Sequence, residues 1–367
     1  MSNAVWYALI VVALVVGIAV GYVIAPMLHK PAPPTSAPFA VGAAGTLKFA
    51  FTDILNEMQS LYPSIKIAPP FFKGSGEVAQ KEVTTGVFSV VASADTTTIP
   101  SVLFKNNVTD YEIAFGVTQM VVIVDLNSTY GREVYDLWKQ AQSYQPFSAQ
   151  WNETWRKIFD IIAFSPAVVG VSNPFTDPSG YQAICVVKLA GLAFFNNENY
   201  LFNAIYGNSS KYIMRNTEID LLTLMEAGQV QFILSAYTSN AIPQTKEYKG
   251  TAYITLPPMV NLGDLSYVNY YHLVNFTWSE LGVTKSFICN PVVYTITIPK
   301  NAPNREAAVD FMLLLFSPMG QRILEENGIT PIVPGIVYGN YSSVPAILRA
   351  FTAPVSEYPQ YASIFPG

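Results

Sequence analysis

The chain has few charged residues, and this scarcity limits what it can bind. Of its 367 residues only 12% are charged, with 20 Lys and Arg against 25 Asp and Glu, so the formal net charge is −5. No run of Lys and Arg is longer than two residues, whereas nucleic-acid binding requires a broad basic surface. The composition therefore excludes a nucleic-acid-binding protein and predicts a surface made largely of uncharged polar side chains.

The chain also lacks the residues and motifs on which most enzymes depend. It has two histidines and no HExxH, CxxC, Walker or nucleophile-elbow pattern. His272 lies in the tyrosine-rich segment NYYHLVNF, where a packed ring is a better interpretation than a catalytic base. Asp95 and Asp177 are the alternative, as a carboxylate pair, but a loop acid and a helix N-cap explain them better. We therefore predict that the protein is not an enzyme and uses no cofactor.

Cysteine is as scarce as histidine, since only Cys185 and Cys289 occur. In an oxidising compartment the two would form a single disulfide bond, whereas two cysteines so distant in sequence can equally be buried thiols. The sequence leaves both interpretations open.

One long hydrophobic run is present, at the N-terminus. Ala4 to Ala25 contains 22 residues without a charge, enough to cross a hydrocarbon core of ~30 Å as a helix. No Lys or Arg precedes the run and Pro26 follows its end, which favours an uncleaved anchor over a signal peptide. We predict a transmembrane anchor over residues 1–28 and a proline-rich linker over residues 29–38 that holds the folded part off the membrane.

The sequence contains opposing indications of the side of the membrane on which the folded part lies. Lys30 follows the hydrophobic run and weakly favours the cytoplasmic side. Six N-x-[ST] acceptor sequences favour the opposite side. The six acceptor asparagines are Asn107, Asn127, Asn152, Asn208, Asn275 and Asn340. Together with the low charge, these acceptor sequences predict a single-pass cell-membrane protein whose folded part is an extracellular glycoprotein.

From Phe39 onward, apolar and amphipathic stretches alternate in a way that is typical of α/β proteins. Residues 39–45 predict a strand, and residues 46–63 place their apolar side chains on one face of a helix. The alternation continues through residues 65–95, which predicts a parallel sheet flanked by helices.

Two further apolar stretches suggest that the chain passes between two lobes. Residues 116–125 and 286–299 are each expected to form one long strand, and the two strands are expected to lie side by side as crossings. On this topology lobe 1 consists of residues 39–116 and 295–367. Lobe 2 consists of residues 117–294, inserted between the two parts of lobe 1.

Four strand ends and strand-to-helix turns carry glycine or hydroxyl residues. They are AAGTLK with Thr46, KGSGEV with Ser75, ASADTTTIP with Ser93, and SNPFTDPSGYQ with Asp177. Asp177 has N-cap chemistry and Pro178 suits a first helical position, so the last stretch alone indicates only a capped helix. Such turns all lie at the carboxyl ends of the strands, where open α/β sheets bind ligands. Together they predict that N–H and O–H donors at helix starts hold an oxyanion.

Six segments of the chain occur in the order in which they are found in archaeal tungstate/molybdate-binding proteins: AGTL, GSG, SADTTTIP, SNPFTDPSGYQ, NPVVYTITIPKNAPN and SPMGQRILEENG. The sequence resembles that family over roughly residues 40–335. The resemblance implies an α/β, two-lobed periplasmic-binding-protein-like fold of type II, which closes on a tetrahedral oxyanion. It also implies the role of an extracellular solute-binding protein of an ABC importer.

The resemblance assigns the ligand-binding residues motif by motif. Thr46 stands where the family has the serine of AGSL, and Ser75 matches the serine of GSG. Asp177 and Tyr181 match the aspartate and tyrosine of DPCGYR, and this aspartate approaches the metal of the bound oxyanion. Asp177 is therefore a metal contact only through the metal of the ligand. Two further residues complete the expected set: Ser93 of the SADTTTIP turn, and Tyr237, which aligns with the tyrosine of FEYxS.

The chain departs from the family pattern at three positions. Ala236 stands in place of the glutamate of FEYxS, and in the family this glutamate supplies a second carboxylate to a six-coordinate metal. Ser179 stands in place of a cysteine, and Gln182 stands in place of an arginine. Two carboxylates repel a dianion unless they bond to its metal, so the loss of one should favour plain tetrahedral hydrogen bonding. The selectivity of the site for tungstate and molybdate over sulfate is left open, and hydrogen phosphate is an alternative ligand.

The sequence therefore predicts a monomeric, membrane-anchored receptor that captures tungstate or molybdate between two lobes and hands it to an ABC permease. One alternative is a receptor for a sulfate- or phosphate-type oxyanion. A second is an interaction ectodomain that kept the fold and lost its ligand. The donor turns of Thr46, Ser75, Ser93 and Asp177 argue against the second alternative, because a cleft without a ligand has no reason to keep them.

Overall fold

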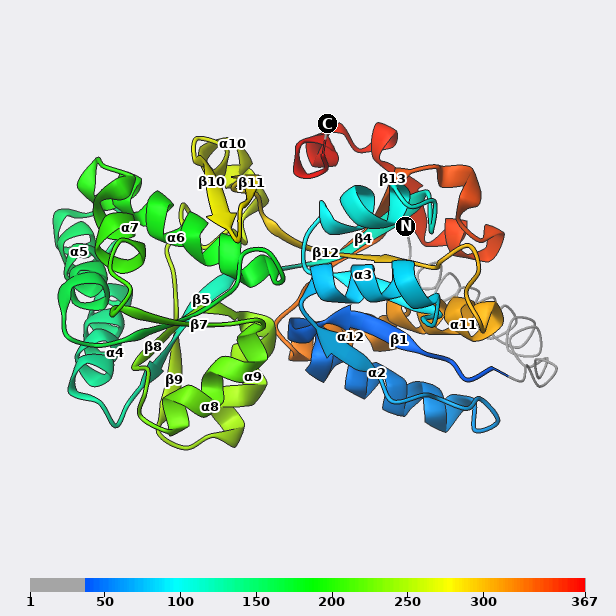
Figure 1. Ribbon diagram of the computed structural model, residues 1–367, viewed down its shortest axis with the longest axis horizontal. Helices are drawn as coiled ribbons and strands as arrows, with labels where there is room; N and C mark the ends of the chain where they lie inside the picture. The colour runs from blue at the N-terminus through cyan, green and yellow to red at the C-terminus, as the bar shows by residue number, and fades with distance from the viewer. Residues whose placement is uncertain (1–36, 367) are drawn as a thin grey trace, which may run out of the picture. The chain divides into compact units, whose positions relative to one another are not determined.

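Two β-sheets, each flanked by its own helices, form the structure (Figure 1). The computed structural model describes residues 37–366, and the chain from Ala37 onward forms one compact unit. The predicted membrane anchor and all but the last two residues of the predicted linker lie outside the described residues.

The first sheet has seven strands and is mixed, with the order β14-β13-β4-β12-β3-β1-β2. Strand β1 pairs in parallel with β2 and β3, while β12 runs antiparallel to β3 and β4. This sheet and its helices are called lobe 1 below. Its strands are β1 Val41–Ala44, β2 Phe71–Lys73, β3 Val90–Ser93, β4 Tyr111–Thr118, β12 Val292–Thr297, β13 Thr330–Gly339 and β14 Thr352–Pro354, and its main helices are α2 Lys48–Leu61, α3 Ser75–Thr85, α11 Arg305–Phe316 and α12 Pro318–Glu326.

The second sheet has five strands, with the order β7-β6-β8-β5-β9. Strand β6 is parallel to β7 and β8, and β5 is antiparallel to β8 and β9. This sheet and its helices are called lobe 2. Its strands are β5 Met120–Asp125, β6 Val169–Ser172, β7 Tyr212–Arg215, β8 Phe232–Tyr237 and β9 Thr251–Thr255, and its helices are α4 Thr129–Gln142, α5 Ala149–Phe164, α6 Pro178–Phe195, α7 Asn199–Tyr206, α8 Leu221–Glu226 and α9 Thr238–Glu247.

A two-stranded hairpin and several short helices complete the described chain. The hairpin consists of β10 and β11, which are antiparallel. Their bounds, followed by those of α10 and the short helices of one or two turns, are β10 Asn275–Glu280, β11 Val283–Ile288, α10 Val268–Tyr271, Gly45–Leu47, Ile99–Phe104, Glu218–Asp220, Leu265–Tyr267, Tyr341–Ser343, Ala346–Ala350, Val355–Glu357 and Pro359–Ile364.

The two stretches do carry the chain between the lobes, but the prediction that each of them is one long strand was wrong. The first stretch is divided at Gln119, where β4 ends in one sheet and β5 begins in the other. The second stretch is divided before Pro291, which has no N–H to donate to a sheet ladder. There β11 belongs to the hairpin, while Cys289 N donates to Val274 O (3.1 Å) and β12 begins at Val292. An apolar run shows that residues are extended but not which sheet they join.

Helix α6 is the central helix of lobe 2. It has 18 residues with a mean hydropathy of 1.2, and 83% of it is buried. By length and composition it is long and apolar enough to cross a membrane, and so are α11 and α12 if the bent pair is taken as one span. A mostly buried helix of this kind is the core helix of a folded domain, and it presents its N-terminus at the end of the neighbouring strands.

Glu82 of α3 gives lobe 1 a pH-dependent stability. The side chain is buried, and its Oε2 accepts a hydrogen bond from Phe88 N (2.9 Å). Burial raises its pKa from 4.5 to about 7, so the folded protein keeps a proton that the unfolded chain has released over this window. The free energy of unfolding should therefore fall as the pH rises from 4.5 to 7. We expect Glu82→Gln to raise the unfolding temperature at pH 8 and to leave it nearly unchanged at pH 4.5. Equal shifts at both pH values would contradict this.

Candidate functional site

Turns from both lobes meet where the strands end. In lobe 1, Thr46 follows β1, and Ser75 is the first residue of α3, which follows β2. In lobe 2, Asp177 follows β6 and is the N-cap of α6. The turns lie so close that a Cβ atom at Gly74 would be 2.0 Å from Thr176 O of the other lobe. The lobes are therefore closed on each other, with the donor turns at their boundary.

The three hydroxyl residues expected from lobe 1 differ in their surroundings. Thr46 Oγ1 is buried and has no hydrogen-bond partner within the described part of the chain. Ser75 Oγ accepts a hydrogen bond from Ala94 N (3.0 Å), which leaves its own proton available. Ser93 Oγ donates to Asp95 Oδ1 (3.1 Å). Thr46 and Ser75 are therefore better placed than Ser93 to donate to an anion.

Asp95 is the loop acid that the sequence suggests, and it also joins the lobes. Its carboxylate accepts hydrogen bonds from Thr97 N (3.2 Å), Thr98 N (2.8 Å) and, across the boundary, Tyr181 OH (3.1 Å). Burial, followed by the charge of Asp95, raises the pKa of Tyr181 well above 10, so the hydroxyl keeps its proton. Tyr181 was expected to contact the ligand, and in this closed form its proton is donated to Asp95.

Asp177 caps α6, as its place before Pro178 predicts. Its Oδ1 accepts from Ser179 N (3.1 Å), which satisfies one of the free N–H groups at the helix start. Its Oδ2 accepts from Ser179 Oγ (2.9 Å) and from Glu218 N (2.9 Å). The carboxylate is almost fully buried, at 4% exposure. The capping interpretation is therefore confirmed, and the same carboxylate lies at the boundary between the lobes.

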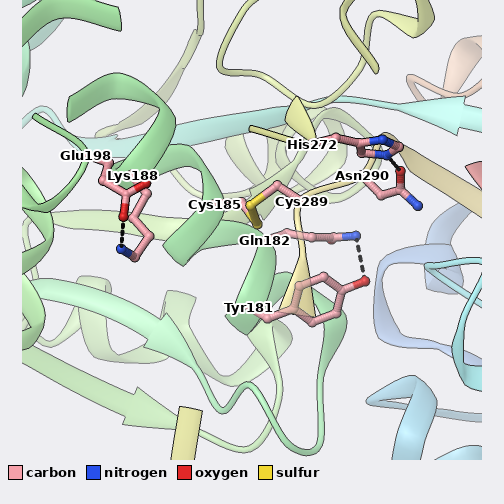
Figure 2. The surroundings of a disulfide bond; sticks show 8 residues. All are labelled: Tyr181, Gln182, Cys185, Lys188, Glu198, His272, Cys289 and Asn290. Carbon is pink, nitrogen blue, oxygen red and sulfur yellow. Dashed lines mark hydrogen bonds and ion pairs between the residues drawn. A yellow bond between two sulfur atoms is a disulfide. The ribbon is translucent and has the colours of Figure 1, made fainter. Parts of the chain in front are cut away.

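Gln182 and Tyr237 form a chain of hydrogen bonds that ends in lobe 1. Tyr237 OH donates to Gln182 Oε1, and Gln182 Nε2 donates to Ala94 O (3.4 Å). The Gln182 amide also reaches Tyr181 OH (3.5 Å), as Figure 2 shows. The glutamine that stands in place of an arginine therefore links the lobes through an uncharged amide and orients the Tyr237 hydroxyl.

Three polar side chains at the boundary were not among the expected site residues. Ser239 Oγ and Tyr294 OH share a hydrogen bond across the lobes (2.7 Å). Glu218 lies beside Asp177, through the hydrogen bond already described. The segment RNTEID that carries Glu218 is also a strand-to-helix turn, following β7, and this position could have singled it out. Ala236, which stands in place of the family's glutamate, is fully buried within β8.

A disulfide bond fixes the helix that carries Tyr181 and Gln182. Cys185 and Cys289 are bonded, with their Cα atoms 5.5 Å apart, and they are 104 residues apart in sequence. Figure 2 shows the bond one helical turn from Tyr181. Tyr181 also stacks on Phe287 of the β10–β11 hairpin, with ring centroids 4.8 Å apart. The bond therefore holds the hairpin against the start of α6.

Removal of this disulfide should lower the stability of the folded part. Closing a loop of this length restricts the unfolded chain, so the Cys185→Ser/Cys289→Ser variant should lose about 3–5 kcal/mol of unfolding free energy. Chemical unfolding of the oxidised protein and the variant measures the loss. Native protein whose disulfide has been reduced is the matched control, and it should unfold like the variant. If the oxidised protein, the reduced protein and the variant all unfold at the same midpoint, the disulfide does not contribute to stability.

A hollow of about 740 Å³ opens beside the donor turns. It is lined by Asp95 from lobe 1, by Asp177 and Tyr181 from lobe 2, and by Lys285 from the hairpin. Lys285 Nζ donates to Phe175 O (3.3 Å), and burial lowers its pKa while Asp95 opposes this shift. The closed lobes thus have an opening on the side of the hairpin, with a cationic side chain at its edge.

Comparisons with known proteins agree with this geometry. Residues 39–330 match the family described as bacterial extracellular solute-binding protein. The molybdate/tungstate-binding protein WtpA of Thermococcus kodakarensis is 29% identical over 322 residues, which cover 81% of this chain and 83% of that protein.

Two solved structures share the fold. The sulfate-binding protein SubI from Mycobacterium tuberculosis has a TM-score of 0.56 at 10% identity, covering 89% of this chain and 98% of that one. The periplasmic molybdate-binding protein of Azotobacter vinelandii has a TM-score of 0.54 at 14% identity, covering 80% and 98%. They confirm the α/β, two-lobed, periplasmic-binding-protein-like fold. The chain is a solute-binding protein and belongs to the bacterial extracellular solute-binding protein family.

Proposed function

We propose that the protein is a receptor that traps tungstate or molybdate between its two lobes and delivers the anion to an ABC permease. The observation that carries the proposal is the meeting of donor turns from both lobes at a closed, buried boundary. Thr46 and Ser75 from lobe 1 and Asp177 from lobe 2 are each less than a twentieth exposed. Helix starts supply N–H groups and a partial positive charge, which suit an anion.

The choice of ligand rests on the relatives and on the donor chemistry. WtpA is named for molybdate and tungstate, and it covers most of this chain. Hydroxyl and N–H donors bind the oxygen atoms of a tetrahedral oxyanion without a resident metal or cofactor. Closure of the lobes around the anion is the expected mechanism, with the hinge at the two crossings. The protein then performs no chemical step, and its role ends with delivery to the permease.

The proposed cellular setting is the outer surface of the membrane, with the folded part anchored by the hydrophobic run at residues 4–25 and acting as a monomer. The Cys185–Cys289 disulfide supports an oxidising compartment. The acceptor asparagines support it too, since glycosylation needs exposed sites: Asn107, Asn127, Asn208, Asn275 and Asn340 are exposed, and Asn152 is half-buried.

Calorimetric titration of residues 37–367 with tungstate, molybdate, sulfate and phosphate tests the proposal. We expect sub-micromolar dissociation constants for tungstate or molybdate. Tight binding of sulfate or phosphate alone would assign the site to those anions instead. The absence of heat with all four anions would contradict the receptor proposal and favour an interaction ectodomain.

A further inference from the structure

The C-terminal segment, residues 355–366, packs on lobe 1 beside the opening between the lobes. It contains the short helices Val355–Glu357 and Pro359–Ile364, and Figure 1 draws it in red on the side of lobe 1 nearest the β10–β11 hairpin. The match to the solute-binding family ends at residue 330, so the segment lies outside it. Three of its residues form part of the wall of the hollow described above: Ser363, Phe365 and Pro366.

Aromatic packing anchors the segment to lobe 1. The ring of Phe365 is buried and stacks on Tyr338 of β13, with the ring centroids 5.0 Å apart. Tyr338 OH donates a hydrogen bond to Pro366 O (2.6 Å). Ile364 is buried in the same apolar cluster as Phe365, against one face of the seven-stranded sheet. The segment is therefore a fixed part of lobe 1.

One backbone carbonyl of the segment connects two parts of the receptor that matter for closure. Ile364 O accepts hydrogen bonds from Thr96 Oγ1 and from Asn290 Nδ2 (3.0 Å). A carbonyl oxygen has two lone pairs, so these two donors use its full capacity. Thr96 follows Asp95, whose carboxylate accepts from Tyr181 OH across the boundary. The segment therefore holds the loop whose acid joins the two lobes.

Asn290 lies in the second crossing between the lobes. Its neighbour Cys289 is bonded to α6 of lobe 2, and β12 of lobe 1 begins at Val292. Its Oδ1 shares a hydrogen bond with His272 Nε2 (2.6 Å), which Figure 2 shows. Residues at such crossings change conformation when the lobes open, because the hinge absorbs the rotation. The bond to Ile364 O therefore ties the hinge to lobe 1 in the closed form.

We infer that residues 355–366 act as a strap that holds the receptor closed, because Ile364 O fixes the loop of Asp95 and restrains the second crossing. The inference rests on the proposed function, since it concerns closure around the bound anion. Thr96 and Asn290 are then positioning residues, which act through Asp95 and through the hinge. An open receptor captures the anion before the lobes close on it, so the strap should govern the rate of release rather than the rate of capture.

Two variants of residues 37–367 test the inference through the kinetics of tungstate binding. Thr96→Val keeps the shape of the side chain and removes its hydroxyl. Asn290→Asp keeps the size of the side chain and the oxygen that faces His272, but has no N–H to donate to Ile364 O. The loss of one hydrogen bond should speed up release about 5-fold in each variant and leave capture within about 2-fold of native. Exchange of bound tungstate against excess radioactive tungstate measures release, and uptake by the empty protein measures capture.

Two further variants separate the strap from a general loss of stability. Thr352→Val is the matched control, because Thr352 is also buried and its Oγ1 donates to a backbone carbonyl within lobe 1, Leu348 O (3.1 Å). It should lower the unfolding temperature about as much as Thr96→Val and release tungstate at the native rate. Thr96→Ser keeps the hydroxyl, so its release should also stay native.

Three outcomes would overturn the inference. Release that stays within 2-fold of native in both Thr96→Val and Asn290→Asp would show that the segment does not hold the closed form, while the receptor function stands. Release that is equally fast in Thr352→Val would assign the effect to stability alone. A native protein that binds no tungstate in calorimetry would overturn the proposed tungstate function and the inference with it.

Discussion

Replacement of Gly74 by alanine should weaken tungstate binding by at least about 100-fold, or ~2.7 kcal/mol. The added Cβ atom would lie 2.0 Å from Thr176 O and 2.8 Å from Thr176 C in the opposite lobe. Both are backbone atoms, so no flexible side chain can move to relieve the clash. The backbone at Gly74 (φ −56°, ψ 139°) suits alanine, so the substitution should hinder closure and leave each lobe folded. Calorimetry measures the affinity, and small-angle X-ray scattering measures closure.

Gly76→Ala is the matched control for this prediction. Gly76 is the second residue of α3, two positions after Gly74, and faces the same loop, but its added Cβ atom would be 3.4 Å from Phe175 O, an ordinary contact. Its affinity should stay close to native. If Gly74→Ala binds tungstate as tightly as Gly76→Ala, the ligand does not require the closed arrangement described above.

Asp177→Asn is expected to weaken tungstate binding by about 100-fold. Asparagine is as good an N-cap as aspartate, so its oxygen can still accept from Ser179 N and start α6. The substitution removes the carboxylate that the family resemblance assigns as a contact to the metal of the oxyanion; without such a contact its negative charge would repel the anion. It also removes the second oxygen, which accepts from Glu218 N. Contacts to a charged group are worth roughly 1.5–3 kcal/mol, which sets the expected loss. Titration of tungstate into the purified variant measures it, and the unfolding temperature shows whether the fold is kept.

Asp264→Asn serves as the control for the capping role. Asp264 also caps a helix start in the inserted part of the chain, accepting from Ser266 N (2.9 Å), but it lies near the crossing between the lobes and away from the donor turns. It should lower stability about as much as Asp177→Asn does and leave binding intact. Native-like affinity in Asp177→Asn would show that Asp177 is a cap and nothing more.

The sequence predicted the site best where a single turn carries the information. AAGTLK, KGSGEV and SNPFTDPSGYQ each contain a strand end, a small or hydroxyl residue and a helix start, and the structure places all three at the lobe boundary. Asp177 is a cap, as local chemistry indicates. Local patterns succeed here because the conformation of a turn is decided by residues within it.

The sequence failed where the outcome depends on distant partners. The stretch around Ser286 was expected to be one strand, but its pairing with β10 and the bond from Cys289 to Cys185 depend on residues far away in the chain. Glu218 was missed for a related reason. Its turn matches none of the recognised motifs, and only the fold brings it beside Asp177.

The central claim is that a metal oxyanion is held between the lobes by the turns of Thr46, Ser75 and Asp177. A crystal structure of residues 37–367 grown with tungstate tests it most directly, because tungsten gives a strong anomalous peak. The account predicts one such peak at the boundary, within contact distance of Thr46, Ser75 and Asp177. A peak found only in the hollow beside Lys285, or no peak in crystals soaked above the dissociation constant, would contradict it.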